Sequence, residues 1–375
     1  MYNVCEVTTD EIINLARPAS DPSVEHNREP KCSIPVSGTR TAERLESPPK
    51  NRATARRYRR AFFCGLFRAG PDGRKAFLKA LDYSAAFNSK TTPISIALQQ
   101  LTASINFEKY VLARCRDRRL DRVVISITDG TITDGQPGVD TVEYLVFELA
   151  DCDARKQMSL IGRVDVAWRL RSLHDIATGL EQLHRNGIFH QDVKPSNVLV
   201  FERVHSKLAD FGRSACEGQT PPHADCDFAG DYSYAPPDVL YGYMLPDLRL
   251  RQLGFDAYLL GSMLAFFFAG EGTTALVLNE LDTEYADWQH FNGDVEDVKL
   301  HLRDAFVRVA TKFATDAPPG CAPELTSILR QLCDPDPALR GHPQEKRGLP
   351  QQFSLERYVS RFDALARRAE LGLFI

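Results

Sequence analysis

Two short polar segments, residues 190–200 and 210–212, constrain this chain more than any other part of its sequence. The first reads His-Gln-Asp-Val-Lys-Pro-Ser-Asn-Val-Leu-Val and the second reads Asp-Phe-Gly. Their reactive side chains are two carboxylates, one ammonium and one amide, on Asp192, Asp210, Lys194 and Asn197. Transfer of a phosphoryl group needs a residue that orients the attacking hydroxyl, groups that neutralise the phosphate oxygens and ligands for a divalent metal. These side chains supply most of that set.

Apolar residues lie on both sides of the reactive part of the first segment. Ile188 and Phe189 precede it, and Val198, Leu199 and Val200 follow it. We expect two short buried strands that hold a polar loop between them, which is how a rigid scaffold presents reactive side chains. An Asp-x-x-x-x-Asn pattern alone is typical of a solvated turn, but a turn does not account for all of these groups together with Asp-Phe-Gly.

The order of these residues resembles the H-R-D-L-x-x-x-N and D-F-G signature of the eukaryotic-type Ser/Thr protein kinases. The resemblance implies that Asp192 is the catalytic base and that Lys194 contacts the transferred phosphate. It implies that Asn197 and Asp210 are the metal ligands. It therefore implies ATP and Mg²⁺ as cofactors and a protein as the second substrate.

The same resemblance implies an α+β, two-lobed protein-kinase-like fold. Its small N-lobe would contain an antiparallel sheet and one helix, and its larger C-lobe would be mainly helical. We expect the N-lobe at residues 56–148 and the C-lobe, with C-terminal helices, at 149–375. Residues 1–55 are rich in Pro, Ser, Thr and charge, which predicts a flexible leader. The 375 residues, 43% of them apolar, suffice for a sizeable core.

Two apolar runs, 61–67 and 74–81, flank a Gly-Pro-Asp-Gly turn and predict a β-hairpin. Within the second run, Ala76-Phe77-Leu78-Lys79 is similar to the V-A-I-K motif, whose lysine grips the α and β phosphates of the nucleotide. By resemblance, Lys79 is a cofactor-binding residue. A single lysine at a strand end is more often a surface residue.

A helix is predicted next, with an apolar stripe formed by Ile94, Leu98, Leu101, Ile105 and Leu112. The stripe is interrupted by Glu108. A carboxylate on a core-facing stripe is costly unless it is paired, so Glu108 requires a buried cation, for which Lys79 is the natural candidate. This matches the Lys to Glu pair of the kinases. The alternative is that Glu108 lies at the edge of the helix.

Residues 142–150 predict an apolar strand that leads into the hinge between the lobes. By resemblance, Phe147 is the gatekeeper, and the backbones of Glu148 and Ala150 contact adenine. Further along the chain, Val166, Leu170, Leu173, Ala177, Leu180 and His184 form a helical stripe that runs into the 190–200 segment.

Three further matches extend the resemblance toward the C-terminus. Residues 234–240, Tyr-Ala-Pro-Pro-Asp-Val-Leu, resemble the Y-x-A-P-E closure, with Asp238 in place of Glu. Arg340 matches the distant arginine that pairs with this acid. Asp256 matches the buried aspartate that anchors the catalytic loop.

Three departures from the family pattern stand beside these matches. The glycines upstream of Lys79 do not have the G-x-G-x-x-G spacing of the loop that covers the phosphates. Gln191 replaces the arginine that binds an activation-loop phosphate in regulated kinases, so we expect activity that does not depend on phosphorylation of residues 213–235. Asp231 stands where the family usually has Thr, and its carboxylate could either bind Lys194 or interfere with substrate.

Bulk properties set further expectations. A net charge of -4 implies no general preference for nucleic acid. The nine cysteines include no C-x-x-C pair, which favours reduced thiols and a cytoplasmic location. The longest apolar run, residues 257–269, is too short for a membrane span and predicts a buried helix, so no membrane partner is expected.

Three classes of function remain open. The first is an active Ser/Thr protein kinase, because every chemical group named above is present. The second is a pseudokinase or scaffold, which the unrecognised glycine-rich loop and Asp231 favour. The third is a small-molecule kinase of the antibiotic or choline type. That class lacks the Lys-Pro of Lys194 and Pro195, so it ranks last.

Overall fold

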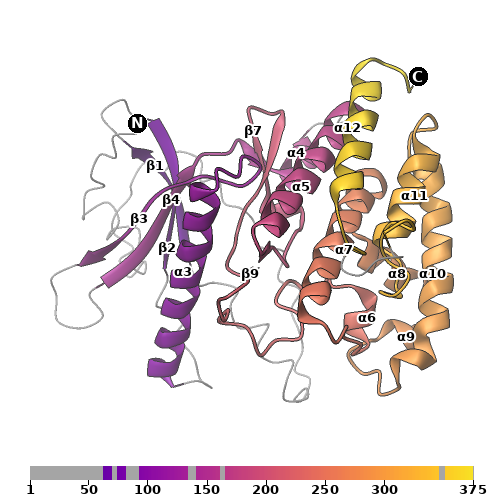
Figure 1. Ribbon diagram of the computed structural model, residues 1–375, viewed down its shortest axis with the longest axis horizontal. Helices are drawn as coiled ribbons and strands as arrows, with labels where there is room; N and C mark the ends of the chain where they lie inside the picture. The colour runs from indigo at the N-terminus through magenta and orange to yellow at the C-terminus, as the bar shows by residue number, and fades with distance from the viewer. Residues whose placement is uncertain are drawn as a thin grey trace, which may run out of the picture.

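The computed structural model of the chain describes residues 62–69, 74–81, 93–133, 141–160, 165–345 and 351–374. The predicted leader, residues 1–55, lies outside these ranges, as do the predicted turn at 70–73 and residues 82–92. The described residues form a small sheet-containing part and a larger helical part, which lie side by side in Figure 1. This arrangement confirms the predicted two-lobed α+β fold.

The small part is built on an antiparallel sheet with strand order β1-β2-β4-β3. Its strands are β1 (Phe62–Ala69), β2 (Arg74–Leu81), β3 (Ser126–Thr133) and β4 (Thr141–Glu148). The predicted hairpin is confirmed, because β1 pairs with β2 and Cys64 lies opposite Lys79. The glycine Gly65 lies within β1, opposite Leu78.

Alternation along β2 decides where Lys79 points. Ala76 and Leu78 face a small apolar cluster with Ile132 and Val146. Successive strand residues point to opposite faces, so Lys79 faces the other side of the sheet, where Leu81 packs into the main core. That side carries the helix α3 (Ile94–Asp117).

The buried face of α3 follows the predicted stripe from Leu101 onward and includes Glu108. The prediction is wrong for the first turn, because Ile94 is 45% exposed. Leu98, one turn further on, is partly buried where it packs against the main core. The apolar periodicity of the sequence therefore continues beyond the part of α3 that is packed.

The larger part is mainly helical. Its helices are α4 (Ala154–Leu160), α5 (Val166–Arg185), α6 (Pro237–Leu240), α7 (Leu248–Ala269), α8 (Thr273–Glu280), α9 (Thr283–Ala286), α10 (Val295–Asp316), α11 (Ala322–Leu332) and α12 (Glu356–Glu370). Its short strands are β5 (Cys152–Asp153), β6 (Ile188–Phe189), β7 (Val198–Phe201), β8 (His205–Leu208) and β9 (Ala215–Cys216), and a 3-10 turn, η1, spans Pro195–Asn197. The predicted strands around the 190–200 segment are confirmed as β6 and β7.

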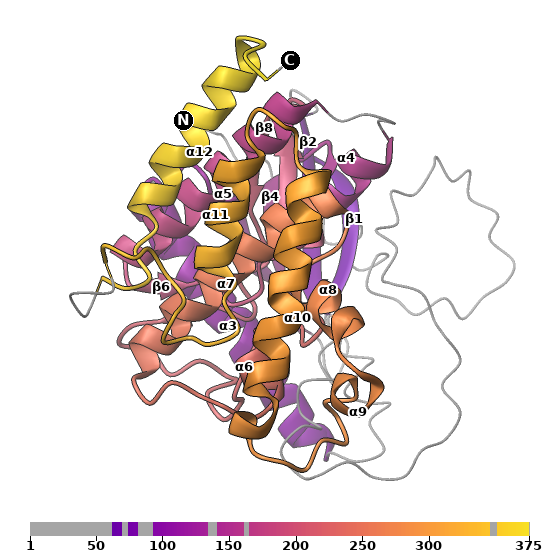
Figure 2. The same cartoon turned by 90° about the vertical axis from the view of Figure 1, so that its right-hand side faces the viewer.

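Helix α5 positions the predicted catalytic loop, which lies within residues 190–200. The side chain of Asp165 caps its first turn by accepting a hydrogen bond from the Ala167 N–H at 3.2 Å. The predicted stripe is buried from Leu170 to His184. After the helix ends, Gly187 adopts a φ of 65°, a conformation that favours glycine, and the chain turns directly into β6. Helix α12 runs along the outer side of α5 (Figure 2).

Helix α7 lies at the centre of the helical part. Its length and apolar composition would allow it to cross a membrane, but 83% of its apolar window is buried within the protein. This burial is what a core helix of a folded domain shows. The prediction of a buried helix at residues 257–269 is confirmed.

Candidate active site

An ion cluster joins the sheet, α3 and the Asp-Phe-Gly segment, with Lys79 and Glu108 buried and Asp210 about half exposed. The Lys79 Nζ donates to Glu108 Oε1 at 2.8 Å and to Glu108 Oε2 at 2.9 Å. It also donates to Asp210 Oδ1 at 3.1 Å. Glu108 is 1% exposed, so the predicted pairing of Glu108 with Lys79 is confirmed and the alternative of a helix-edge position is wrong.

Burial and charge act against each other in this cluster. Burial would lower the pKa of the Lys79 ammonium, but the carboxylates of Asp210 and Glu108 raise it above its usual value. Burial raises the pKa of Glu108, and the charge of Lys79 offsets part of that rise. The Lys79 charge lowers the pKa of Asp210 to about 2. Lys79 and Asp210 are therefore ionised at neutral pH.

Asp256 of α7 holds the catalytic loop in place, as predicted. It is fully buried, and its Oδ2 accepts from His184 Nε2 and from the His190 N–H, both at 2.8 Å. Its Oδ1 accepts from the Gln191 N–H at 2.7 Å. Gln191 has a φ of 65°, an unfavourable conformation for a residue with a side chain, and these bonds offset its cost.

The loop residues Asp192, Lys194 and Asn197 converge on one another. The Lys194 Nζ lies 3.0 Å from Asp192 Oδ2. The Asn197 Nδ2 donates to the Asp192 carbonyl oxygen at 2.9 Å and to Asp192 Oδ2 at 3.0 Å. Burial raises the pKa of Asp192, and the Lys194 charge opposes that rise. His190, which is completely buried, completes the loop through a 3.1 Å contact from its Nε2 to the Ala209 carbonyl oxygen.

Asp231 contributes a further carboxylate to this group. Its N–H donates to Asp192 Oδ1 at 2.9 Å, and its Oδ2 lies 3.5 Å from Lys194 Nζ. The sequence left open whether Asp231 contacts Lys194, and the structure shows that it does.

Residues 213–235, the predicted activation segment, pack against α3 and the helical core. His223 is buried and lies edge-on to Phe107 of α3, with ring centroids 6.3 Å apart. At the end of the segment, the predicted pair of Asp238 and Arg340 is confirmed by a 2.6 Å hydrogen bond from Arg340 Nη2 to Asp238 Oδ1. Both side chains are buried, so this bond holds residues 234–240 against the core.

The predicted hinge follows β4. The strand ends at Glu148 and does not continue to residue 150 as the sequence suggested. The Glu148 carboxylate accepts from Lys207 Nζ at 2.7 and 2.9 Å, and the Glu148 N–H donates to the Ile125 carbonyl oxygen at 3.1 Å. Ala150 is partly buried in the connection that follows. Adenine contacts by the backbones of Glu148 and Ala150 stay a prediction.

The structure thus brings six predicted residues into one site: Lys79, Glu108, Asp192, Lys194, Asn197 and Asp210. Glu148 and Ala150 lie apart from them, at the connection between the two parts. Sequence reasoning missed the bond of Lys207 to Glu148 and the contact of His223 with Phe107. The period-2 pattern of β8 was the only available signal for Lys207, and it does not identify a partner.

The donor set at Asn197 and Asp210 fits Mg²⁺. Both side chains offer oxygen atoms, which hard cations prefer. Asp210 is about half exposed, with Oδ1 bonded to Lys79, so its second oxygen is free to face a ligand. No group of three or more His, Cys, Asp or Glu side chains in the described ranges could hold a metal by itself.

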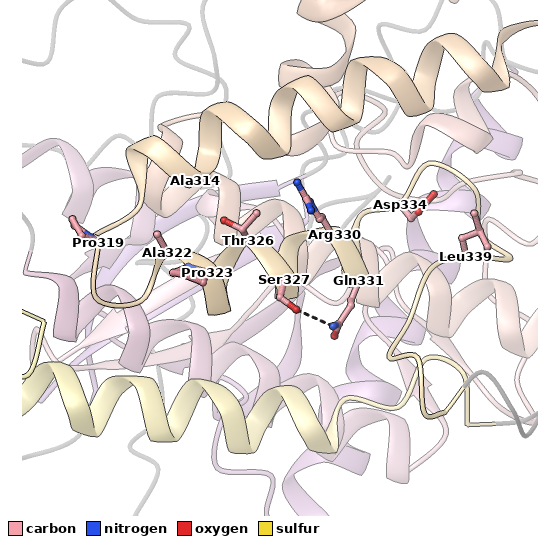
Figure 3. A pocket seen from close by; sticks show the side chains of 10 residues that line it. All are labelled: Ala314, Pro319, Ala322, Pro323, Thr326, Ser327, Arg330, Gln331, Asp334 and Leu339. Atoms are coloured by element: carbon pink, nitrogen blue, oxygen red, sulfur yellow. Dashed lines mark hydrogen bonds between the residues drawn. The ribbon is translucent and has the colours of Figure 1, made fainter.

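A groove of about 730 Å³ lies elsewhere, along α11 and the end of α10 (Figure 3). Its lining includes Pro319, Pro323, Thr326 and Arg330. None of the predicted site residues lines it. It is therefore separate from the candidate active site.

The small part contains a sheet and a buried Lys-Glu pair, and the helical part beside it carries the Asp192 loop. Together these features define the protein-kinase-like class of fold. The chain belongs to the protein kinase family, because the model of the protein kinase domain matches residues 87–347, more than half of its length. The resemblance seen in the motifs is thereby confirmed at the level of the family.

Individual relatives are distant. The cysteine-rich receptor-like protein kinase 1 of Arabidopsis thaliana is 28% identical over 149 residues, which are 38% of this chain and 23% of that protein. The serine/threonine-protein kinase mos of Gallus gallus is 27% identical over 240 residues, covering 60% of this chain and 68% of mos. The serine/threonine-protein kinase greatwall of Xenopus laevis is 39% identical over 72 residues, 19% of this chain and 8% of that protein. The chain thus spans only a small part of the first and third of these relatives.

Proposed function

We propose that this protein transfers the γ-phosphoryl group of ATP to Ser or Thr hydroxyls of a protein substrate. The observation that carries the proposal is the convergence of two ion clusters, one around Lys79 and one around Asp192. The names of the relatives mos and greatwall, both serine/threonine-protein kinases, support the choice of acceptor.

Each residue has a role in this proposal. The Asp192 carboxylate accepts the proton of the substrate hydroxyl and orients the attacking oxygen. Lys79 binds the α and β phosphates, and the pair with Glu108 holds its ammonium in position. Lys194 neutralises the phosphoryl group as it is transferred. Because the transition state is loose, positioning and charge neutralisation supply most of the rate acceleration.

Asn197 and Asp210 would hold Mg²⁺. The metal supplies positive charge against the β and γ phosphates. The low pKa of Asp210 supports this role, because a carboxylate that stays ionised is available to a cation over the whole neutral range.

We further propose that transfer does not require a phosphorylated activation segment. Gln191 is a neutral amide and is only 5% exposed, so this position offers no charge to a phosphate. Ser214 is completely buried and donates to the Phe211 carbonyl oxygen at 2.7 Å, which makes it a poor phosphorylation site. His223 and Asp238 already tie the segment to the core.

A pseudokinase or scaffold is the second candidate. The observation that favours it is the contact of Asp231 with Lys194, because a carboxylate beside this ammonium weakens its hold on a phosphate. The proposed kinase activity still stands first, since Lys79, Asp192 and Asp210 are all present and Lys79 is bonded to Asp210.

The test is phosphoryl transfer from labelled ATP with Mg²⁺ to a panel of proteins and Ser/Thr peptides. Wild type is compared with Asp192→Ala and Asp210→Ala. Asp304→Ala is the matched control, because this carboxylate is 70% exposed on α10. We expect transfer by wild type and the control, and none by the other two, with ATP binding retained in Asp192→Ala. Absence of transfer by wild type that binds ATP would instead favour the scaffold.

A further inference from the structure

We propose that Asp231 competes with the γ-phosphoryl group of ATP for the Lys194 ammonium and so limits both ATP affinity and transfer rate. This inference rests on the proposed function, because it concerns the same Lys194. It assigns to Asp231 an electrostatic effect that opposes the reaction, in addition to its place in the fold.

Three hydrogen bonds that do not need its charge help to hold Asp231 in position. Its N–H donates to Asp192 Oδ1 at 2.9 Å. Its Oδ1 accepts from the Ser233 N–H at 3.2 Å and from Ser233 Oγ at 2.8 Å. The second oxygen, Oδ2, is the one directed at Lys194, at 3.5 Å. An amide oxygen could also accept both Ser233 bonds, although more weakly than a carboxylate.

The residue before Asp231 shows how closely this segment approaches the catalytic loop. A Cβ atom on Gly230 would lie 2.2 Å from the carbonyl oxygen of Gln191, which is far inside van der Waals contact. Only glycine fits there without a backbone shift. The backbone at Gly230 is therefore held against the loop, and the two Ser233 bonds hold the Asp231 carboxylate beside Lys194.

The charges around Lys194 explain the predicted effect. The ammonium lies between the Asp192 and Asp231 carboxylates, at 3.0 and 3.5 Å, and its side chain is only 21% exposed. Burial would lower the pKa of the Lys194 ammonium, but the Asp192 and Asp231 carboxylates raise it above its usual value, so Lys194 is a cation with two anionic neighbours. An arriving phosphoryl group must share this ammonium and also meets the negative charge of Asp231. Like charges repel each other more strongly the closer they lie and the less water surrounds them.

The experiment compares wild type with Asp231→Asn, which keeps the oxygen for Ser233 and removes the charge. Asp227→Asn is the matched control, since this exposed carboxylate lies in the same segment. Dissociation constants of ATP and ADP are measured by calorimetry at fixed Mg²⁺. We expect Asp231→Asn to tighten ATP about tenfold, as one removed charge repulsion of this kind allows, and to leave ADP unchanged. The turnover number for a Ser/Thr peptide should rise as well.

Two outcomes overturn the inference. One is an unchanged or lower ATP affinity in Asp231→Asn, and the other is an equal gain for ADP, which lacks the γ phosphate. If Asp231→Asn does not fold, as judged by its thermal melt, the same measurement is made on Asp231→Thr, which also removes the charge.

The proposed function and this inference fail separately. Absence of transfer by wild type contradicts the proposed function, but the ratio of ATP to ADP affinity still decides the role of Asp231. Transfer by wild type with no change of this ratio in Asp231→Asn contradicts only the inference.

Discussion

Lys79 and Glu108 are 29 positions apart in the sequence and form a two-pronged ion pair that is almost completely buried. The pair joins β2 to α3 and lies beside Asp210 of the Asp-Phe-Gly segment. A buried charge without its partner is strongly destabilising, even where the intact pair adds little net stability. The pair is therefore as much a structural requirement as a proposed catalytic one.

The Lys79→Met variant should lose roughly 3 kcal/mol of unfolding free energy, because it leaves Glu108 buried without a cation. Urea unfolding of Lys79→Met against Lys75→Met measures this, since Lys75 is an exposed residue of the same strand. The double variant Lys79→Met, Glu108→Leu should recover much of the loss. A double variant as unstable as the single one would contradict the explanation.

The pair of Lys79 and Glu108 could be predicted from the sequence. Glu108 interrupts an apolar stripe, so the need for a buried cation was visible in the chain itself. The loop around Asp192 was visible because its reactive groups are close in sequence. Both features can be read from short stretches of sequence. For Glu108, the free-energy cost of burying an unpaired carboxylate limits the partner to a buried cation.

Other contacts had no such signal. Lys207 bonds to Glu148 across 59 positions, and in the sequence either residue alone is typical of an ordinary surface charge. His223 meets Phe107 only because the activation segment packs against α3. Ile94 shows the opposite error, since its apolar periodicity is real but its side chain is 45% exposed. Tertiary packing determines these contacts, and the apolar periodicity of a sequence carries no information about which elements pack together.

The buried pair of Asp238 and Arg340 should also be essential for stability. Arg340 Nε donates to the Asp334 carbonyl oxygen at 3.1 Å, and its guanidinium lies 5.0 Å from the centre of the Tyr258 ring. Arg340→Met should cost about 3 to 5 kcal/mol, because Asp238 remains buried and unpaired. Chemical unfolding is compared with Arg330→Met, an exposed arginine of α11. Equal stabilities of the two variants would show that the pair does not hold the closure.

Asp256→Asn should disable the catalytic loop without abolishing nucleotide binding. An amide has one acceptor oxygen, whereas the Asp256 carboxylate accepts bonds from His184, His190 and Gln191. At least one buried donor is left unpaired, at a cost of about 1 to 3 kcal/mol. We expect a large fall in turnover number with a nearly unchanged dissociation constant for ATP. Full activity of Asp256→Asn would mean that the loop keeps its shape without these bonds.

Activity should be insensitive to the phosphorylation state of the activation segment. Thr220 is exposed, whereas Ser214 is buried. Ser233 is also exposed, but its hydroxyl donates to Asp231. Thr220→Ala and phosphatase-treated wild type should therefore show the turnover number of untreated enzyme within about twofold, since Gln191 offers no charge to a phosphate. Loss of activity on phosphatase treatment, restored by rephosphorylation, would contradict this.

His223 should make the stability of the protein depend on pH. Burial, together with the nearby Arg213 charge, lowers the pKa of His223 to about 4. In the unfolded chain a histidine has a pKa of about 6.5, so between these values the unfolded state binds the extra proton. The contribution of neutral His223 is therefore complete above about pH 6.5 and is lost as the pH falls toward 4, and it amounts to at most about 3 kcal/mol.

Unfolding free energies of wild type and His223→Phe, measured between pH 4.5 and 7.5, test this contribution. Phenylalanine keeps a ring against Phe107 but cannot be protonated, so the variant should lose less stability on acidification than wild type. The difference between the two curves should grow as the pH falls below about 6.5. Parallel curves over the whole range would mean that His223 becomes protonated as easily in the folded protein as in the unfolded chain, and that its burial against α3 does not persist in solution.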